Sequence, residues 1–557
     1  MENILILYEQ SNLDWCKRLE TQLGVLQLRF PFQIQNVHST HKDLANSAAD
    51  AWVVVVLLSE PFCRQGMLHQ KDLAASLKQR IAKGKPVYRL QVSTNPGVDW
   101  LETQDAWPLN HFLDQLSEAR AETALVNLAE TIAANFQPRG LLRSLHLQGL
   151  GPGDHLLLEA APRFNLITGD NGLGKSFLLE CAWWALTGTW ADYPALPRNG
   201  KGPAAMTVGW QGDGDWQPQL TSAYNRETRA WPSPPQAVPF YNLSVYARSD
   251  GSFCVWDPLR ARSTPPPGAN RVHGAMTLTR DQVWHGLYEE VRGQTRTLCR
   301  GVLKGWLHWQ RQEPETFDAF TRILQLLAED EQPLTPGDPL PIPGFDEEIP
   351  TLIYPYGAVP VVHAAASVKR IVGLAYMLVW TWEQHGKYVG LNEPVDHMIV
   401  LVDEIEAHLH PRWKRSVIPA LLSVGQALHT NLAIQYLITT HGPMVLAGLE
   451  PIFDREQDRL FTFGLDKEQR QAQLRQLPFR KHGRADHWFT SEAFGMNQAR
   501  SAEAEKAIEQ ARRLQREKQP DPEAVAQTHA VLERVLGEHD GFWSRWAFFA
   551  EQHGVAL

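Results

Sequence analysis

The stretch that decides the fold of most of this chain is FNLITGDNGLGKSFLLE, residues 164–180. An apolar run opens it, a glycine-rich turn follows, and an apolar helical pattern begins directly after that turn. The turn matches G-x-x-x-x-G-K-[ST], in which backbone N–H groups and a helix N-terminus cradle phosphates. The sequence therefore predicts a strand, a phosphate loop and a helix, with Gly169, Asn171, Gly172 and Gly174 in the loop.

The two residues that complete the motif have their own predicted roles. Lys175 is expected to reach the β- and γ-phosphates of a nucleoside triphosphate, and the Ser176 hydroxyl is expected to bind Mg²⁺. The alternative is a glycine turn that matches by chance. The apolar run before the turn and the helix after it favour the phosphate loop.

Length and composition limit the function classes. The 557 residues suggest two to four domains, and a net charge of −9 offers no overall basic field for nucleic acid. The five cysteines are scattered without a C-x-x-C pair, which favours a reducing cytosol over a disulfide framework. The N-terminal residues do not have a signal-peptide pattern, and the apolar runs are too short to cross a bilayer. We expect a cytoplasmic protein without membrane spans.

A second motif supplies acids for the predicted nucleotide site. Residues 398–402 form an apolar strand that ends in Asp403 and Glu404. An apolar strand followed by two acids is the Walker B arrangement, so Asp403 is expected to hold Mg²⁺ and Glu404 to position and deprotonate the attacking water. The alternative is an acidic pair that caps the next helix.

Two further positions complete an ordered set. His441 follows another apolar strand and is expected to contact the γ-phosphate and sense hydrolysis. Ser367 follows a run of alanines at the start of a strong helix, where small residues and a helix N-terminus suit a phosphate. The alternative for Ser367 is an ordinary helix N-cap.

The order of phosphate loop, small-residue helix start with serine, strand with Asp-Glu and strand with histidine resembles the ABC-type ATPases. Within them it is most similar to the soluble SMC, RecF and OLD-like branch of bacterial defence-type AAA ATPases, over roughly residues 141–470. The resemblance implies that Lys175 and Ser176 of one subunit meet Ser367 of another, so that ATP and Mg²⁺ are buried in a head-to-head homodimer. The family signature LSGGQ is replaced by AASVKR, and no glutamine loop can be placed.

The histidines of HLHP, His408 and His410, form a candidate zinc pair. A third ligand at helical spacing is missing, so we interpret them instead as contacts to an opposite subunit or as a helix cap.

The first 137 residues alternate strand and helix patterns, which predicts a doubly wound parallel sheet. The segments ILILYEQSNLDWCKRLETQL and AWVVVVLLSEPFCRQGMLHQKDLAASL resemble a Toll/interleukin-receptor (TIR) domain. The family often cleaves NAD⁺ with a helix glutamate. Counting from Phe62, that position is Lys71, with Asp72 next to it, and Met67 replaces the usual aromatic residue. Glu60 and Glu9 are further acids near strand ends. A degenerate scaffold is therefore preferred to an NAD⁺ hydrolase.

The predicted fold class is α/β with three parts. Residues 1–137 form the TIR-like domain, residues 141–480 form the ABC-type P-loop ATPase domain with a long insert at about 195–350, and residues 481–557 form a helical C-terminal tail. The aromatic residues near the C-terminus of the tail fit one apolar helix face, which favours packing on the ATPase over stacking on bases.

The sequence as a whole favours an ATP-binding and ATP-hydrolysing switch that dimerises around ATP and controls its TIR-like domain or a bound effector, in bacterial antiviral defence. Candidate partners are a second copy of the chain or a higher oligomer, a separate effector protein and a phage-derived trigger. Nucleic acid is not indicated. The alternatives are a DNA-maintenance ATPase of RecF or SMC type, an ATPase-regulated TIR NAD⁺ hydrolase, and a scaffold that binds ATP without turnover.

Overall fold

The computed structural model describes most of the chain, and all structural statements refer to the described residues. These are residues 2–27, 32–38, 44–64, 71–82, 87–94, 106–107, 111–133, 141–198, 202–211, 219–232, 242–258, 260, 275–291, 293–329, 333–389, 395–466, 468, 470–496 and 498–555. The chain divides into two compact units, one of residues 1–141, 186–188 and 209–242 and one of the remainder. Met67, the Pro-rich stretches 233–240 and 263–270, and the expected boundary at 135–140 lie outside the described residues.

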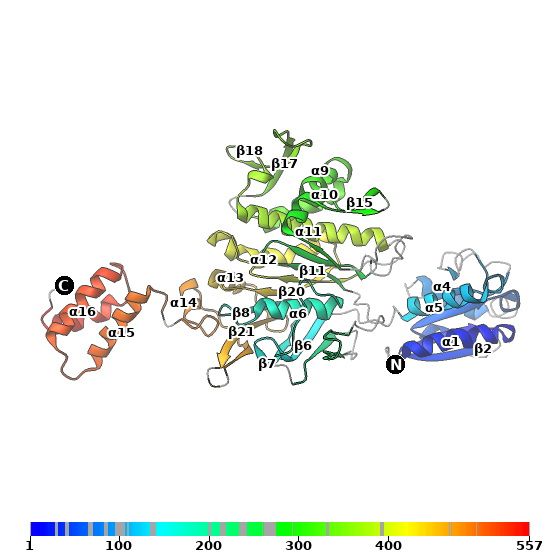
Figure 1. The fold of residues 1–557 in the computed structure, drawn as a ribbon, viewed down its shortest axis with the longest axis horizontal. Coiled ribbons are helices and arrows are strands. Elements are labelled where there is room, and N and C mark those ends of the chain that lie inside the picture. Colours follow the sequence, from blue (N-terminus) through cyan, green and yellow to red (C-terminus); the bar gives the residue numbers. More distant parts are fainter. Residues whose placement is uncertain are drawn as a thin grey trace. The chain divides into compact units, whose positions relative to one another are not determined.

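The N-terminal unit contains a sheet of five parallel strands in the order β2-β1-β3-β4-β5. Figure 1 shows this unit in blue, with α1, α4 and α5 beside its strands. Its core strand β3 is buried at every position, which suits a valine-rich strand covered on both faces. One apolar cluster joins the sheet to α1 and α5, and a second joins it to α2, α3 and α4. The elements are β1 (Glu2–Tyr8), η1 (Gln10–Asn12), α1 (Leu13–Gln27), β2 (Phe32–His38), α2 (Leu44–Asp50), β3 (Val53–Leu58), α3 (Glu60–Phe62), α4 (Lys71–Ala82), β4 (Val87–Gln91), β5 (Ala106–Trp107), η3 (Leu113–Gln115) and α5 (Glu118–Ala133).

The second unit is built on an eight-stranded sheet in the order β13-β12-β11-β19-β20-β8-β21-β22. Its five central strands, β11, β19, β20, β8 and β21, are mutually parallel. Their carboxyl ends therefore meet at one edge, where ligands of open α/β sheets bind. The sheet strands are β8 (Phe164–Gly169), β11 (Leu243–Ala247), β12 (Phe253–Trp256), β13 (Ala275–Leu278), β19 (His397–Val402), β20 (Ala433–Thr439), β21 (Asp458–Asp466) and β22 (Gln471–Leu477).

Helices cover the two faces of this sheet differently. Alternate strand residues such as Val400 and Tyr436 join α9 to α12 in one large apolar cluster. Residues of the opposite parity face α6, as the ring contact of Trp183 with Tyr246 shows. The helices are α6 (Lys175–Thr187), α8 (Arg280–His285), α9 (Gly301–Gln312), α10 (Pro314–Leu327), α11 (Ala366–Val389), α12 (Pro411–Leu428) and α13 (Pro443–Leu449).

Smaller elements fill the insert and precede the phosphate loop. β6 and β7 pair in antiparallel fashion before β8, as do β14 and β15. β16, β17 and β18 form an antiparallel three-stranded sheet. The bounds are β6 (Leu141–Leu150), β7 (Gly153–Glu159), β9 (Ala205–Gln211), β10 (Gln219–Ala223), β14 (Leu287–Val291), β15 (Gln294–Cys299), β16 (Thr335–Leu340), β17 (Ile349–Tyr354), β18 (Gly357–Pro360) and η5 (Val361–His363).

Two local predictions were wrong. The apolar spacing of DQVWHGLYEEV, residues 281–291, predicts one helix, but α8 ends at His285 and β14 follows. Gly286 adopts φ 100°, and a Cβ there would lie 2.7 Å from the Arg300 carbonyl oxygen, so the turn into the hairpin requires glycine. The pattern of PLNHFLDQL, residues 108–116, also predicts a helix, but the described residues of this segment form only the 3₁₀ turn η3.

The C-terminal tail is a small helical segment with its own core. Trp546 is fully buried in a cluster with residues of α15 (Ala502–Arg516), α16 (Pro522–Val535) and α17 (Trp543–Gln552). Its indole N–H donates to His529 Nδ1 over 3.2 Å. The expectation that these aromatic residues pack on the ATPase is therefore corrected for Trp546, which packs within the tail. The elements after β22 are α14 (Ala485–Phe489), α15 (Ala502–Arg516), α16 (Pro522–Val535) and α17 (Trp543–Gln552). Within the described residues, no helix is long and apolar enough to cross a bilayer.

Candidate nucleotide site

The glycine-rich turn between β8 and α6 has the backbone that the motif requires. Gly169 and Gly174 adopt φ 126° and 99°, a region that favours glycine. A Cβ at Gly169 would lie 2.5 Å from the Phe463 carbonyl oxygen, and one at Gly174 would lie 2.7 Å from Pro152. Both glycines are thus fixed by conformation and by space, and the turn opens directly into the N-terminus of α6.

The Lys175 side chain lies along this turn. Its Nζ donates to the carbonyl oxygens of Gly169 and Asp170 over 2.9 and 2.8 Å, and the residue is only 6% exposed. Burial lowers the pKa of the Lys175 ammonium, while the nearby carboxylates of Glu404 and Asp403 act in the opposite direction. A buried cation of this kind gains from an anionic ligand that restores its lost solvation.

Backbone donors of the turn complete a cradle for an anion. The N–H groups of Asn171 to Gly174 belong to the turn between β8 and α6, outside the hydrogen-bond ladder of the sheet. They lie at the N-terminal end of α6, where the helix dipole favours negative charge. Asn171 and Gly172 therefore belong to the same anion-binding turn as Gly169 and Gly174.

The two predicted Mg²⁺ ligands are in contact. The Ser176 hydroxyl donates to Asp403 Oδ2 over 2.8 Å, although the residues are 227 positions apart. The other carboxylate oxygen, Oδ1, accepts from the Thr439 hydroxyl over 2.6 Å. Asp403 is 3% exposed, so these bonds hold its carboxylate against the start of α6.

This donor set fits a nucleotide-bound Mg²⁺. The ion takes one or two protein oxygens and completes its octahedron with waters and substrate phosphates. Ser176 and Asp403 supply such oxygens beside the phosphate loop. Among the described residues there is no group of three or more His, Cys, Asp or Glu side chains that could hold a metal by themselves.

Glu404 occupies a strained turn after β19. Its φ of 49° is left-handed, which is uncommon for a residue other than glycine, and its backbone N–H donates to Thr439 Oγ1 over 2.8 Å. The helix α12 begins only at Pro411, so the acidic pair does not cap it. The side chain is half-buried beside the phosphate loop.

His441 lies two residues after β20 and is held through its backbone. Its N–H donates to Glu406 Oε1 over 2.5 Å, and Thr440 donates its hydroxyl proton to Glu406 Oε2 over 2.7 Å. Glu406, 8% exposed, thus fixes the turn that carries His441. Sequence patterns did not single out Glu406 or Thr439, because their partners come from neighbouring strands.

Ser367 is the second residue of α11, and the Ala365 carbonyl accepts the first helical bond, so Ser367 is not the N-cap. One turn later, Arg370 donates to the carbonyl oxygens of Asp403 and Glu404 over 2.8 and 3.1 Å. Burial lowers the pKa of this guanidinium. Arg370, which no sequence motif marks, connects the start of α11 to the predicted metal ligand Asp403 and the predicted base Glu404.

Arg248 lies directly after β11, at the same edge of the sheet as Asp403. The sequence did not place a glutamine loop, and the turn after β11 does not contain a glutamine. Arg248 follows β11, which pairs in parallel with β19, and it forms ion pairs with Glu180 and Asp192, each at 3.3 Å. Burial raises the pKa of Glu180, and the Arg248 charge opposes this rise. The residues after β11 are therefore an arginine, a serine and an aspartate.

The HLHP histidines differ in their positions. His410 is the N-cap of α12, and its Nδ1 accepts from the Arg412 N–H over 3.4 Å, as the capping interpretation predicted. His408 is exposed with φ 63°.

The candidate residues for NAD⁺ cleavage in the N-terminal unit differ in solvent exposure and in their partners. Lys71 and Asp72 are exposed in the first turn of α4. Glu60 is exposed and forms an ion pair with Arg64 over 2.6 Å. Glu9 is buried and lies 3.7 Å from His38 Nε2. Asp72 therefore lies on a solvated helix surface.

Comparisons with known proteins match only parts of the chain. Residues 144–214 match the family model described as AAA domain, which covers the phosphate loop. The Septu protein PtuA of Bacillus mycoides (strain KBAB4) is 38% identical over 99 residues, 18% of this chain and 12% of that protein. The Retron Ec83 probable ATPase of Escherichia coli is 47% identical over 47 residues, 8% of each chain. The matched segments thus span about a tenth of these relatives.

Among solved structures, the SMC head domain from Thermotoga maritima aligns with 61% of this chain and 99% of its own, at 14% identity and a TM-score of 0.29. A score this low supports no conclusion about this chain. The match to the AAA domain model includes the glycine-rich turn at residues 169–176.

The Thr439 hydroxyl offers a test of this site. Thr439→Val removes the bonds to Asp403 Oδ1 and to the Glu404 N–H from a buried position, and a methyl group cannot replace them. We expect nucleotide turnover to fall about tenfold or more and stability to fall by about 1–3 kcal/mol. Measurement of kcat and of urea unfolding checks both effects.

Thr381→Val is the matched control. Thr381 is equally buried and donates to the Met377 carbonyl over 2.6 Å, well along α11 from the phosphate loop. The Thr381→Val variant should be less stable than the wild type but should keep the wild-type turnover per folded molecule. Equal kcat values for the two variants would contradict the assigned role of Thr439.

Proposed function

We propose that this chain is an ATP-binding and ATP-hydrolysing switch that closes as a homodimer around ATP and Mg²⁺ and controls its TIR-like domain or a bound effector. The observation that carries the proposal is the contact between Ser176 and Asp403 beside the buried ammonium of Lys175. This arrangement brings a cation, a pair of possible metal ligands and the backbone N–H groups of the phosphate turn together.

The chemistry follows from the positions of these groups. The turn N–H groups and Lys175 would bind the β- and γ-phosphates, and Ser176 and Asp403 would hold Mg²⁺, which would supply charge neutralisation. Glu404 would accept a proton from the water that attacks the γ-phosphorus, while the bond to the β-phosphate oxygen breaks and ADP leaves. His441 is placed on a turn that Glu406 fixes, so it can respond to loss of the γ-phosphate.

Closure of two subunits would place Ser367 of one against the nucleotide of the other. Ser367 lies in the first turn of α11, and Arg370 connects that turn to the carbonyls of Asp403 and Glu404 in its own subunit. ATP shifts such an equilibrium only as far as it binds the closed state better than the open one. Two phosphate sites per dimer provide that difference.

The setting that we propose is bacterial antiviral defence, which the resemblance over residues 141–470 and the TIR-like pattern suggest together. The matched relatives include a Septu protein and a retron ATPase, and their names support a role in defence. NAD⁺ cleavage by the N-terminal unit is less favoured, because Asp72 is solvent-exposed on α4 and Glu60 is paired with Arg64. A scaffold role for that unit implies a separate effector.

A measurement of ATP hydrolysis and of molar mass with and without ATP tests the proposal. We expect the wild-type protein to hydrolyse ATP and to double its mass when ATP and Mg²⁺ are present. Ser367→Arg should still bind ATP but should stay monomeric and lose at least about tenfold in turnover, since the larger side chain blocks close approach. Ser544→Arg, at an exposed serine of the tail, is the control.

The result that would refute the dimer is a mass independent of ATP with full turnover in Ser367→Arg. Absence of ATP binding in the wild type would refute the whole proposal.

A further inference from the structure

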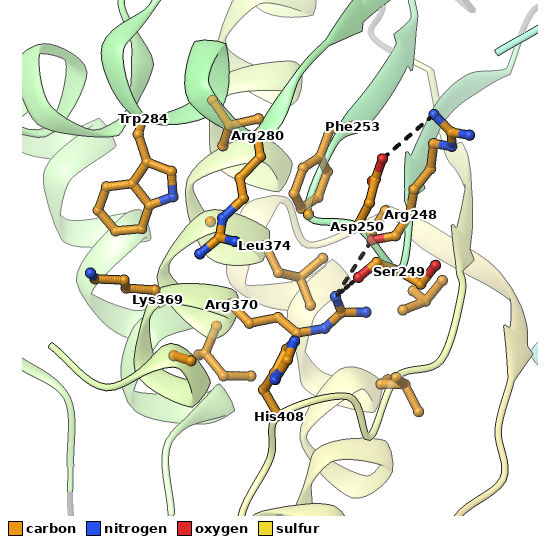
Figure 2. Close-up of a pocket in the computed structure, with 18 of the residues that line it drawn as sticks. Arg248, Ser249, Asp250, Phe253, Arg280, Trp284, Lys369, Arg370, Leu374 and His408 are labelled. Carbon is orange, nitrogen blue, oxygen red and sulfur yellow. Dashed lines mark hydrogen bonds and ion pairs between the residues drawn. The ribbon is translucent and has the colours of Figure 1, made fainter. Parts of the chain in front are cut away.

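A pocket of about 230 Å³ lies between the start of α11, the short helix α8, the turn after β11 and the turn after β19. Figure 2 shows its side chains from these separate segments facing a common space. No step of the proposed ATP chemistry uses this space. Four cationic side chains line it: Arg248, Arg280, Lys369 and Arg370.

One side of the pocket is apolar. Phe253, Val283, Leu374 and Ile371 belong to the large core cluster and line it, and half-buried Trp284 stands beside them. In Figure 2 the Arg280 side chain lies between those of Trp284 and Phe253. Flat apolar groups pack well against an indole and a phenyl ring, so this wall suits a flat apolar ligand body.

The charges at the opening are unbalanced. Arg248 pairs with Glu180 and Asp192, and Arg370 donates to four carbonyl oxygens, so both have partners. Within the described residues, neither the Arg280 guanidinium nor the Lys369 ammonium has an ion pair or a hydrogen bond. Asp250, the acidic residue in the lining, is 3.9 Å from Arg248 and accepts two bonds from Ser252. Two cations therefore face the pocket without a counter-charge.

We propose that this pocket binds a small organic anion, with a flat apolar body against Trp284 and Phe253 and a phosphate or carboxylate group held by Arg280 and Lys369. Arginine and lysine are the side chains that recognise such groups. The volume of about 230 Å³ is large enough for one ring and one anionic group.

The pocket is connected through Arg370 to the turn that carries Asp403 and Glu404. This residue lines the pocket and donates to the carbonyls of Asp403 and Glu404. An occupant that moves Arg370 changes the support of the strained Glu404 turn, so the ligand regulates hydrolysis. This regulatory part rests on the proposed ATPase function, whereas binding to the pocket does not.

Phenyl phosphate is the probe, titrated into the full chain by calorimetry in the absence of ATP. We expect one site per chain, with an affinity at least tenfold greater than those of inorganic phosphate and phenol. Arg280→Gln and Lys369→Gln should each weaken binding at least tenfold. Arg296→Gln, at an exposed arginine of β15, should leave it unchanged and controls for net charge.

Lys175→Ala separates this site from the phosphate loop. Binding that persists in Lys175→Ala supports the pocket, and binding that disappears there would assign the probe to the phosphate loop and overturn the proposal. Absence of binding, or equal binding by Arg280→Gln and wild type, would also overturn it. A probe that binds as expected to a chain that hydrolyses no ATP would uphold the pocket and refute the ATPase.

Discussion

Lys175→Ala is expected to abolish detectable ATP binding, with an affinity loss of about 100-fold or more. The Lys175 Nζ is buried beside the phosphate turn, where burial already lowers its pKa. A charged hydrogen bond contributes about 1.5–3 kcal/mol, and Lys175 would make more than one such bond with the β- and γ-phosphates. The measurement is the rise in melting temperature with increasing ATP and Mg²⁺, because a ligand stabilises the state that it binds.

The protein without ligand should change little in this variant. Lys175 donates there only to the Gly169 and Asp170 carbonyls, which lie next to solvent-accessible loop residues. Lys414→Ala, on α12 and without a role in the site, serves as the control and should keep the full ATP-dependent rise. An unchanged rise in Lys175→Ala would place the nucleotide elsewhere.

The phosphate loop could be predicted because its chemistry is local. The motif glycines, Lys175 and Ser176 all fall within the eight residues 169–176, and the structure places them around one turn. Thr439 and Arg370 could not be found in this way. Thr439 meets Asp403 because β20 pairs in parallel with β19, and Arg370 reaches the same turn from α11. These contacts depend on strand order and helix placement, which residue spacing does not encode.

The wrong helix at 281–291 has a similar cause. Its apolar residues fit a helical period, but the residues after Gly286 pair with β15 instead. Tertiary pairing thus overrides a local preference, as it often does for short segments. Of the tail aromatic residues that were assigned to one helix face, Trp543, Trp546 and Phe549 pack with the other tail helices, whereas Phe548 is exposed.

Glu404→Gln is expected to reduce ATP hydrolysis by about 100- to 10,000-fold, the usual range for loss of a general base, while ATP binding remains. Glutamine keeps the length and the left-handed backbone of Glu404, so the strain and the bond from its N–H to Thr439 are unchanged. The substitution removes only the charge that accepts a proton. Single-turnover rates with bound ATP and Mg²⁺ measure this step without contributions from product release.

Because hydrolysis would no longer reopen the subunits, the ATP-bound dimer of Glu404→Gln should accumulate. Its molar mass should stay doubled, whereas that of the wild type should fall with time. A variant that hydrolyses at the wild-type rate would exclude Glu404 as the base, and a variant that loses ATP binding would make it a structural residue of the phosphate site.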